Sequence, residues 1–271
     1  MTTGPLRLGG VPEHFNLPWH LALESETLTD LEVTWSDQPG GTGQMLARLA
    51  EAELDVVSIL TEGTVREIAK GLPLTILQVY VESPLQWGVF VPGRSTYAEE
   101  SELGGARIAI SRFGSGSHLM AYIHAERLGW SINPEQFVVV KDLNGAIAAF
   151  DAGDADLFLW DRFMTSPLVA DGRFRQIGTQ ETPWPSFVIA ARNEILTGRT
   201  AEVGRVVDAV VGQSRSLMVR DDGSDLVADR YGIAVAQAKE WLASTTFASR
   251  RPADPRIAAE VLATLERAGL K

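Results

Sequence analysis

The sequence predicts an α/β protein of two lobes, each a mostly parallel sheet flanked by helices. Strand-like apolar runs alternate with helix-like segments through residues 6–81 and again through residues 107–168. In each half a similar string stands between a helix and a buried strand, Glu53-Leu54-Asp55-Val56 and Asp154-Ala155-Asp156-Leu157. Two successive sets of strand–helix units therefore imply two α/β lobes.

The first set has strand patterns at residues 6–8, 31–35, 56–60 and 74–81. A short helix follows Asn16 or Leu17, because Pro18 suits the first helical turn. Thr42 is expected to cap the next helix, whose apolar positions fall on one face. A further helix opens at Thr61 and ends at Gly71.

The second set has strand patterns at residues 107–110, 137–140 and 157–160. A helix over residues 119–128 is expected to end at Gly129, Asn144 is expected to cap another, and Asp161 to start a third. After Thr200 the chain is helical to its end.

Two proline-bearing segments mark the joints between the lobes. Ser83-Pro84 and Thr182-Pro183 each precede an apolar strand, and prolines suit sheet edges and bends. They are expected to cross between the lobes, although two unrelated proline-bearing strands would look alike. The predicted division is residues 1–84 with 190–271 as lobe I, and 85–189 as lobe II.

The charge and composition of the chain limit the classes of partner that it can bind. A net charge of -11 in 271 residues disfavours nucleic acid and anionic membrane surfaces, yet allows a local anion site. The chain has no cysteine, and its four histidines lack metal-ligand spacing. No run is long enough to insert into a membrane, and residues 1–8 lack a signal peptide's basic start and apolar core. The sequence as it stands predicts a cytoplasmic protein; removal of a leader would change this to the periplasm or the cell surface.

The loop after the strand at residues 107–110 is the main candidate site. It holds two glycines, three serines and an arginine, and a helix follows it. Helix-start N–H groups attract anions, glycines let the backbone approach a ligand, and hydroxyls add donors. The alternative is an ordinary turn capped by Ser115 or Ser117. The ligand-binding candidates here are Ser111, Arg112, Phe113, Gly114, Ser115, Gly116, Ser117 and His118. Arg112 is the best charge partner for an acid group, and His118 either donates to the anion or merely sits in the first turn.

Further candidates lie in other loops at the carboxyl ends of predicted strands, where open α/β sheets bind ligands. Aromatic side chains there either stack on a ligand or pack in the core, and the carboxylates either meet an amine or stabilise a helix start. These candidates are Glu13, His14, Phe15, Asn16, Trp19, Gly41, Thr42, Thr61, Glu62, Trp160 and Asp161. Nucleotide, phosphate-loop and nucleophile-elbow motifs are missing, so no catalytic residue, metal or cofactor is assigned.

The sequence resembles type II periplasmic-binding-protein-like proteins over nearly its whole length. The resemblance rests on residues 9–19, Pro39-Gly40-Gly41-Thr42-Gly43, Asp55-Val56 and the Ser111-to-His118 loop. The branch contains taurine, alkanesulfonate and nitrate binding components of ABC transporters and thiamine-pyrimidine-synthase-like proteins, and the sequence looks closest to a signal-less subgroup. The resemblance implies two lobes that close about a two-strand hinge, with the anion-binding loop at residues 111–118.

The resemblance implies a small-molecule binding protein that clamps an anionic or zwitterionic ligand between its lobes. The ligand would be sulfonate-, phosphonate- or carboxylate-like, and an ABC transporter permease is the candidate partner. The alternative is a cytoplasmic enzyme on the same fold, of the menaquinone-pathway or pyrimidine-biosynthesis kind. Glu13, His14 or Asp161 would then supply acid–base chemistry. The thiamine-pyrimidine-synthase activity is disfavoured, because those enzymes use a cysteine-rich motif.

Overall fold

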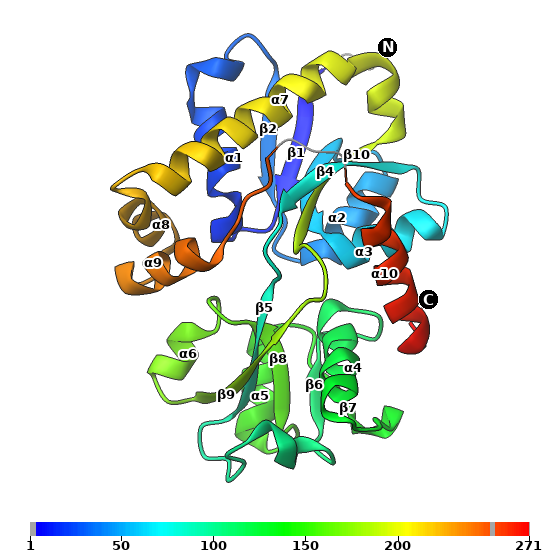
Figure 1. The fold of residues 1–271 in the computed structure, drawn as a ribbon, viewed down its shortest axis with the longest axis vertical. Coiled ribbons are helices and arrows are strands. Elements are labelled where there is room, and N and C mark those ends of the chain that lie inside the picture. The colour runs from blue at the N-terminus through cyan, green and yellow to red at the C-terminus, as the bar shows by residue number, and fades with distance from the viewer. Residues whose placement is uncertain (1–3, 250–252, 271) are drawn as a thin grey trace. The chain divides into compact units, whose positions relative to one another are not determined.

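The computed structural model describes residues 4–249 and 253–270, and these form two compact units. The first unit comprises Met1–Ser83 and Trp184–Val261, and the second comprises Pro84–Pro183 and Leu262–Lys271. Each contains one five-stranded sheet with helices packed on it (Figure 1). The α/β class and the mostly parallel sheets predicted from the sequence are confirmed.

The first unit has the strand order β2-β1-β3-β10-β4. Strands β1, β2 and β3 are parallel, and β10 runs antiparallel to both β3 and β4. Apolar side chains of α2 (Gly41–Ala50), which include Met45 and Leu49, pack against Val57 and Val188 of the sheet, as the sequence predicted. The strands are Leu6–Gly10 (β1), Val33–Asp37 (β2), Val56–Leu60 (β3), Leu74–Val81 (β4) and Phe187–Arg192 (β10).

Helices α1, α2 and α3 of the first unit begin and end close to their predicted positions, with one different cap. Helix α7, however, begins at Asn193 and not at Thr200, and residues 245–249 interrupt the predicted helical region. Gly40, and not Thr42, is the N-cap of α2. Helix α7 bends at Arg199, whose φ of −131° is not helical. The helices are His14–Asn16 (η1), Leu17–Glu24 (α1), Glu26–Leu28 (η2), Gly41–Ala50 (α2), Thr61–Ala69 (α3), Asn193–Val219 (α7), Gly223–Tyr231 (α8) and Val235–Ser244 (α9).

The second unit repeats this plan with the strand order β7-β6-β8-β5-β9. Strands β6, β7 and β8 are parallel, and β5 runs antiparallel to β8 and β9. Phe90 and Phe158 pack with Phe150 of α5 (Leu143–Ala152) in the core. The strands are Gln86–Pro92 (β5), Ile108–Ile110 (β6), Phe137–Val139 (β7), Leu157–Asp161 (β8) and Phe174–Glu181 (β9).

Three helices of the second unit differ from the predictions, two of them because of their caps. The third was expected to start at Asp161, but β8 extends through Asp161 and the helix begins at Ser166. Helix α4 begins at Gly116, three residues before the predicted position, since Ser115 caps it. Asp142, and not Asn144, caps α5 by accepting a hydrogen bond from the N–H of Gly145 (2.9 Å). The helices are Glu100–Leu103 (η3), Gly116–Leu128 (α4), Pro134–Gln136 (η4), Leu143–Ala152 (α5) and Ser166–Ala170 (α6).

The units divide the chain at different places from those predicted. Phe187 of β10 pairs with Leu60 of β3, so residues 184–189 belong to the first unit. The last part of α10 (Pro255–Arg267) belongs to the second unit, where Arg267 contacts Glu126 of α4.

The two similar sequence segments, residues 53–56 and 154–157, each contribute the aspartate of the same arginine–aspartate ion pair, one in each unit. We call this ion pair, with its three hydrogen bonds, the clamp. Asp55 accepts hydrogen bonds from the backbone N–H, Nε and Nη2 of Arg7 at 2.9, 2.9 and 2.7 Å. Asp156 accepts the same three from Arg107 at 3.0, 2.9 and 2.7 Å. Each clamp ties the start of one parallel strand to the start of its neighbour, because Asp55 precedes β3 and Asp156 precedes β8. The two units are therefore built on one pattern down to individual side-chain atoms.

Candidate functional site

The carboxyl edge of the second unit's sheet brings three chain segments together. Strands β6 and β8 are parallel neighbours, with Ala109 paired with Phe158, so the loop after Ile110 and the end of β8 lie at the same edge. Strand β5 runs the opposite way, which puts its first residues there as well. Trp87 of β5 pairs directly with Asp161 of β8. We call this region, with the Ser111–His118 loop, the β8 end at Asp161 and the β5 start at Trp87, the carboxyl-edge site.

The Ser111–His118 loop is held in shape by its own side chains. The Ser117 hydroxyl accepts a hydrogen bond from the N–H of Ser111 (2.9 Å), and the Ser115 hydroxyl accepts one from the N–H of His118 (3.3 Å). Gly114 has a φ of 75°, a left-handed conformation that suits glycine. The capped turn considered for this loop is therefore present, with Ser115 as the cap. The serine hydroxyls hold the loop together.

The first N–H groups of α4 stay available for an anion. Gly116 and Ser117 are its first two residues, whose N–H groups have no partner within a helix. Within the described ranges no other hydrogen bond to these two N–H groups is formed. Because these N–H groups carry the positive end of the helix dipole, they can hold an anion without displacing an existing hydrogen bond.

His118 does not contribute positive charge to the carboxyl-edge site. Its side chain is buried, and burial lowers its pKa to about 4. Nδ1 accepts a hydrogen bond from the N–H of Gly114 (2.9 Å), so the neutral ring carries its proton on Nε2. Edge-on aromatic contacts to Phe113 (5.2 Å) and Phe137 (4.5 Å) surround the ring. His118 therefore positions the loop.

Two exposed cations lie at this edge, and the sequence pointed to only one of them. Arg112 was predicted, and its side chain is exposed. Lys141, which was not predicted, is also exposed and follows β7. Its N–H donates to the Ser111 carbonyl (3.1 Å), and its φ of 71° is uncommon for a non-glycine residue. No local pattern signals that conformation, because it depends on a contact with Ser111.

Large apolar side chains are also exposed at the carboxyl edge. Phe113 follows β6 and is 59% exposed, Val139 ends β7 at 47%, and Met164 follows β8 at 36%. Trp160, a predicted stacking residue, is instead partly buried and stacks on Phe158 (5.1 Å). The apolar surface available to a ligand here therefore comes from Phe113, Val139 and Met164.

Asp161 lies buried at the end of β8, and only one of its oxygens is used. Oδ1 accepts hydrogen bonds from the N–H groups of Phe163 (3.0 Å) and Met164 (2.8 Å), which caps the turn that follows. Oδ2 is buried and accepts no hydrogen bond from any residue in the described ranges. Burial raises the pKa of Asp161 to about 6, against the lowering effect of those two N–H groups.

In the first unit, Thr61 and Glu62 begin α3 and are buried. Thr61 Oγ1 donates to the carbonyl of Pro185 (2.5 Å). Glu62 Oε2 accepts a hydrogen bond from Trp184 Nε1 (3.1 Å), and burial raises the pKa of this carboxyl. Both polar side chains therefore already have partners within the unit.

The predicted residues between Glu13 and Trp19 mostly build an aromatic core. The His14 ring lies 4.8 Å from Phe15 and 4.6 Å from Trp241, and burial lowers its pKa to about 3. Asn16 Nδ2 donates to the Val11 carbonyl (2.7 Å), and Trp19 is fully buried. The structure places the remaining first-unit candidates, Glu13, Gly41 and Thr42, at partly exposed positions.

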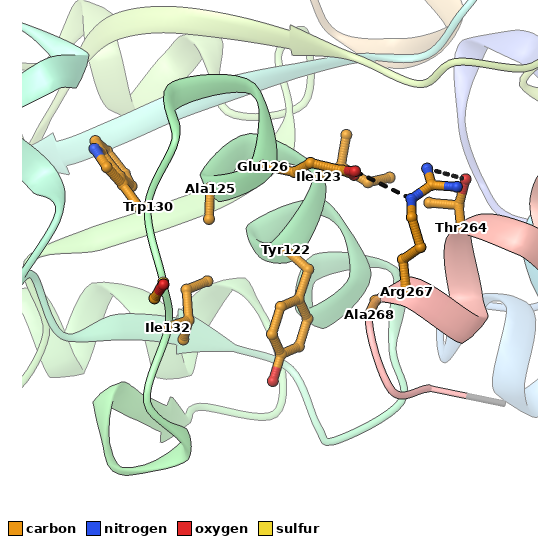
Figure 2. Close-up of a pocket in the computed structure, with 10 residues that line it drawn as sticks. Tyr122, Ile123, Ala125, Glu126, Trp130, Ile132, Thr264, Arg267 and Ala268 are labelled. Atoms are coloured by element: carbon orange, nitrogen blue, oxygen red, sulfur yellow. Dashed lines mark hydrogen bonds and ion pairs between the residues drawn. The ribbon is translucent and has the colours of Figure 1, made fainter.

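A pocket of about 270 Å³ lies elsewhere on the second unit, between α4, the segment after it and the end of α10. Figure 2 shows Tyr122 and Ile132 on one side and Arg267 on the other, where it pairs with Glu126 (3.0 Å). None of the residues predicted to bind a ligand lines this pocket.

Over residues 4–249 and 253–270, no three His, Cys, Asp or Glu side chains gather closely enough to hold a metal ion. In the same described part of the chain, no helix is both long and apolar enough to cross a membrane.

Comparisons with known proteins agree on the fold. The family model described as Ca3427-like PBP matches residues 87–180, which lie in the second unit. A comparison with curated protein sequences finds no match. The structure of the Candida albicans CA3427 gene product, described as having the generic periplasmic binding protein fold, is 28% identical. The alignment covers 99% of this chain and 91% of that chain, with a TM-score of 0.91.

Two more distant structures share the fold. The alkanesulfonate-binding protein SsuA from Xanthomonas axonopodis pv. citri, bound to MOPS, is 22% identical with a TM-score of 0.83, over 99% of this chain and 95% of that one. The ligand binding component of an ABC-type import system from Staphylococcus aureus, with zinc bound, is 13% identical with a TM-score of 0.76, over 99% and 93%. The chain thus has the two-lobed fold of type II periplasmic-binding proteins, and its second unit carries the match to the Ca3427-like PBP family.

Proposed function

We propose that this protein binds a small organic anion as a solute-binding protein, with the anionic group held at the carboxyl-edge site. The observation that carries the proposal is the start of α4, where the N–H groups of Gly116 and Ser117 donate no hydrogen bond to any residue of the described ranges. The loop around them is already fixed by Ser115, Ser117 and His118. A preformed site of this kind loses little conformational entropy when it binds.

Local charge supports an anionic ligand despite the net charge of -11. Arg112 and Lys141 are exposed cations beside the start of α4. At contact distance these two charges and the helix dipole outweigh the screened charges of the remaining surface. A sulfonate, phosphonate or carboxylate group fits this arrangement.

The proposed ligand also has an apolar part, and the exposed side chains of Phe113, Val139 and Met164 support this. They contribute surface from three neighbouring strand ends, so a short hydrocarbon chain or a ring can cover them while its acid group reaches α4. One structural relative is described as an alkanesulfonate-binding protein. That description agrees with an anion carried on an apolar body.

The sharpest test removes one backbone donor and leaves the helix in place. Gly116→Pro deletes the first N–H of α4 at a position that favours proline, and Ser115, with a ψ of 170°, has the backbone conformation that precedes proline. We expect isothermal titration with alkyl sulfonates, phosphonates and carboxylates to show about tenfold or greater weakening for the best ligand, since hydrogen bonds to charged groups contribute about 1.5–3 kcal/mol.

Gly116→Ala is the matched control, because it keeps the N–H and adds only a methyl group. We expect it to bind within about threefold of wild type, and Arg112→Ala to weaken binding most at low salt. Wild-type affinity in Gly116→Pro would exclude the start of α4 as the anion site. Failure of every acid in the panel to bind the unmodified protein would contradict the proposed function itself.

Closure of the lobes about the ligand stays a prediction. Small-angle X-ray scattering with and without the best ligand tests it, because closure lowers the radius of gyration. A permease partner is likewise a proposal. So is the location, which is cytoplasmic for the sequence as it stands and periplasmic or at the cell surface if a leader was removed. A structural relative is described as a component of an ABC-type import system. Fractionation of host cells, followed by co-purification with solubilised membrane proteins, tests both.

A further inference from the structure

Asp161 has a buried oxygen that lacks a hydrogen-bond donor. The residue is 7% exposed, and Oδ1 is used by the turn after β8. Oδ2 is shielded from solvent and receives no hydrogen bond from residues 4–249 or 253–270. Such an atom is costly to bury, because it loses its interactions with water and gains none in exchange.

On the neighbouring strand, Trp87 has a buried hydrogen-bond donor that lacks an acceptor in the described part of the chain. The residue is 5% exposed, and the donor is its indole Nε1–H. Trp87 and Asp161 are direct partners in the antiparallel β5–β8 pair, so their side chains leave the same face of the sheet with Cβ atoms about 5 Å apart. One face therefore carries an acceptor without a donor beside a donor without an acceptor.

The first unit shows what a completed pair of this kind looks like. There the carboxylate of Glu62 and the indole of Trp184 are hydrogen-bonded to each other at 3.1 Å. The Asp161 and Trp87 atoms make no such bond to each other. The same two chemical groups are thus joined in one unit and left unjoined in the other.

Both unjoined groups lie at the edge where the anion is proposed to bind. Asp161 ends the strand beside β6, and the loop that leads to α4 leaves from β6. Neighbouring strands are about 4.8 Å apart, so the loop after β6 and the end of β8 are adjacent at this edge. A ligand that extends from α4 to Asp161 and Trp87 is therefore a short one.

We propose that Asp161 and Trp87 bind a hydroxyl group of the ligand, which donates to Asp161 Oδ2 and accepts from Trp87 Nε1. This inference rests on the proposed function and names the ligand class more closely, as a short hydroxylated organic acid. A hydroxyl completes both groups at once, because it offers one donor and two acceptor lone pairs. An ammonium group has no acceptor for the indole, and a methyl group satisfies neither.

The test compares ligands that differ only in a hydroxyl or a methyl group, for three acid groups. The pairs are 2-hydroxyethanesulfonate with propane-1-sulfonate, 2-hydroxyethylphosphonate with propylphosphonate, and 3-hydroxypropanoate with butanoate. With the acid group that binds, we expect calorimetry at pH 7.5 to show the hydroxylated member binding at least about tenfold more tightly. Including 2-aminoethanesulfonate checks the ammonium alternative.

The variants assign the preference to residues. Asp161→Asn keeps an oxygen for the turn but presents an amide where Oδ2 was, and Trp87→Phe removes the indole donor. Each is expected to reduce the hydroxyl preference to about threefold or less while the methyl analogue still binds. Asp142→Asn is the matched control, because Asp142 also follows a strand at this edge and caps a helix but is exposed. It is expected to keep the full preference.

The possible failures are distinguishable. If no acid binds, the proposed function is wrong and the hydroxyl assignment with it. If an acid binds but its hydroxyl and methyl forms bind equally, only the hydroxyl assignment is overturned. Tighter binding of 2-aminoethanesulfonate than of 2-hydroxyethanesulfonate would also overturn it.

Discussion

Asp55→Ala is expected to lower the free energy of unfolding of the first unit by about 3–5 kcal/mol, the usual cost of removing one partner of a buried ion pair. Asp55 is 1% exposed and accepts three hydrogen bonds from Arg7 and one from Arg192 Nη2 (3.1 Å). Alanine leaves the Arg192 guanidinium buried, with Glu194 as its remaining ion-pair partner among the described residues. Urea unfolding with hydrogen exchange, which reports each sheet separately, measures the loss.

The repeated clamp of the second unit supplies the control. Asp156 makes the same three bonds to Arg107, but the Arg107 side chain is 46% exposed, and no second arginine among the described residues pairs with Asp156. Asp156→Ala is therefore expected to cost only about 1 kcal/mol, because exposed ion pairs contribute little. An equal loss in the two variants would show that burial of the pair is not what makes Asp55 important.

The stabilisation of the folded state by the Asp55 carboxylate also depends on pH. Burial alone would raise the pKa of Asp55, but hydrogen bonds from Arg7 and Arg192 outweigh burial and lower it. A lowered pKa stabilises the folded state above the unfolded value, which is about 3.9, and this contribution is lost as the pH falls through the folded value. The difference between wild type and Asp55→Ala is expected to persist from pH 5 to 8 and to shrink below about pH 4.

Asp161→Asn is expected to have the opposite sign and to raise the free energy of unfolding by about 1–3 kcal/mol at pH 7.5. Burial raises the pKa of Asp161 to about 6, so the folded state disfavours the ionised carboxylate. This penalty is present above the folded pKa and is released as the pH falls from about 6 to 4. Asparagine removes the charge and keeps an oxygen for the N–H groups of Phe163 and Met164.

Urea unfolding at pH 4 and pH 7.5 checks this prediction. The gain is expected at pH 7.5 and is expected to vanish at pH 4, where wild-type Asp161 is itself protonated. Asp142→Asn, which removes an exposed carboxylate that caps α5, is expected to give no gain at either pH. Lower stability of Asp161→Asn at pH 7.5 would mean that capping by the charged carboxylate outweighs its burial. A gain would show that Asp161 lowers the stability of the protein, as residues that bind ligands often do.

The sequence predicted those features that local pattern determines. Strand periodicity located the sheets, and the strings at Asp55 and Asp156 marked equivalent positions in the two units. Local pattern could not choose between neighbouring caps. Asp142 and Asn144 are both good N-caps, and only the hydrogen bond from the Gly145 N–H decides between them.

The part of the site that sequence could not supply depends on strand pairing. Trp87 and Asp161 are far apart in the chain, and their partnership follows from the register of β5 on β8. The same limit applies to Lys141, whose left-handed conformation accompanies a hydrogen bond to the Ser111 carbonyl. Phe15 and Trp19 were candidates to stack on a ligand, but both are buried. The sequence alone does not distinguish an aromatic residue that packs in the core from one that stacks on a ligand. Which candidates bind the ligand stays a prediction.

The strand orders also govern how each sheet assembles from the growing chain. All strands of the second sheet lie between Gln86 and Glu181, so that sheet can be completed from one uninterrupted segment. The first sheet must wait for β10, which inserts between β3 and β4 only after the whole second sheet has been synthesised. Closing so long a loop adds little to the thermodynamic cost, since that cost grows only with the logarithm of loop length, but long-range pairing is slow. The unit whose synthesis begins first is therefore the last to complete its sheet.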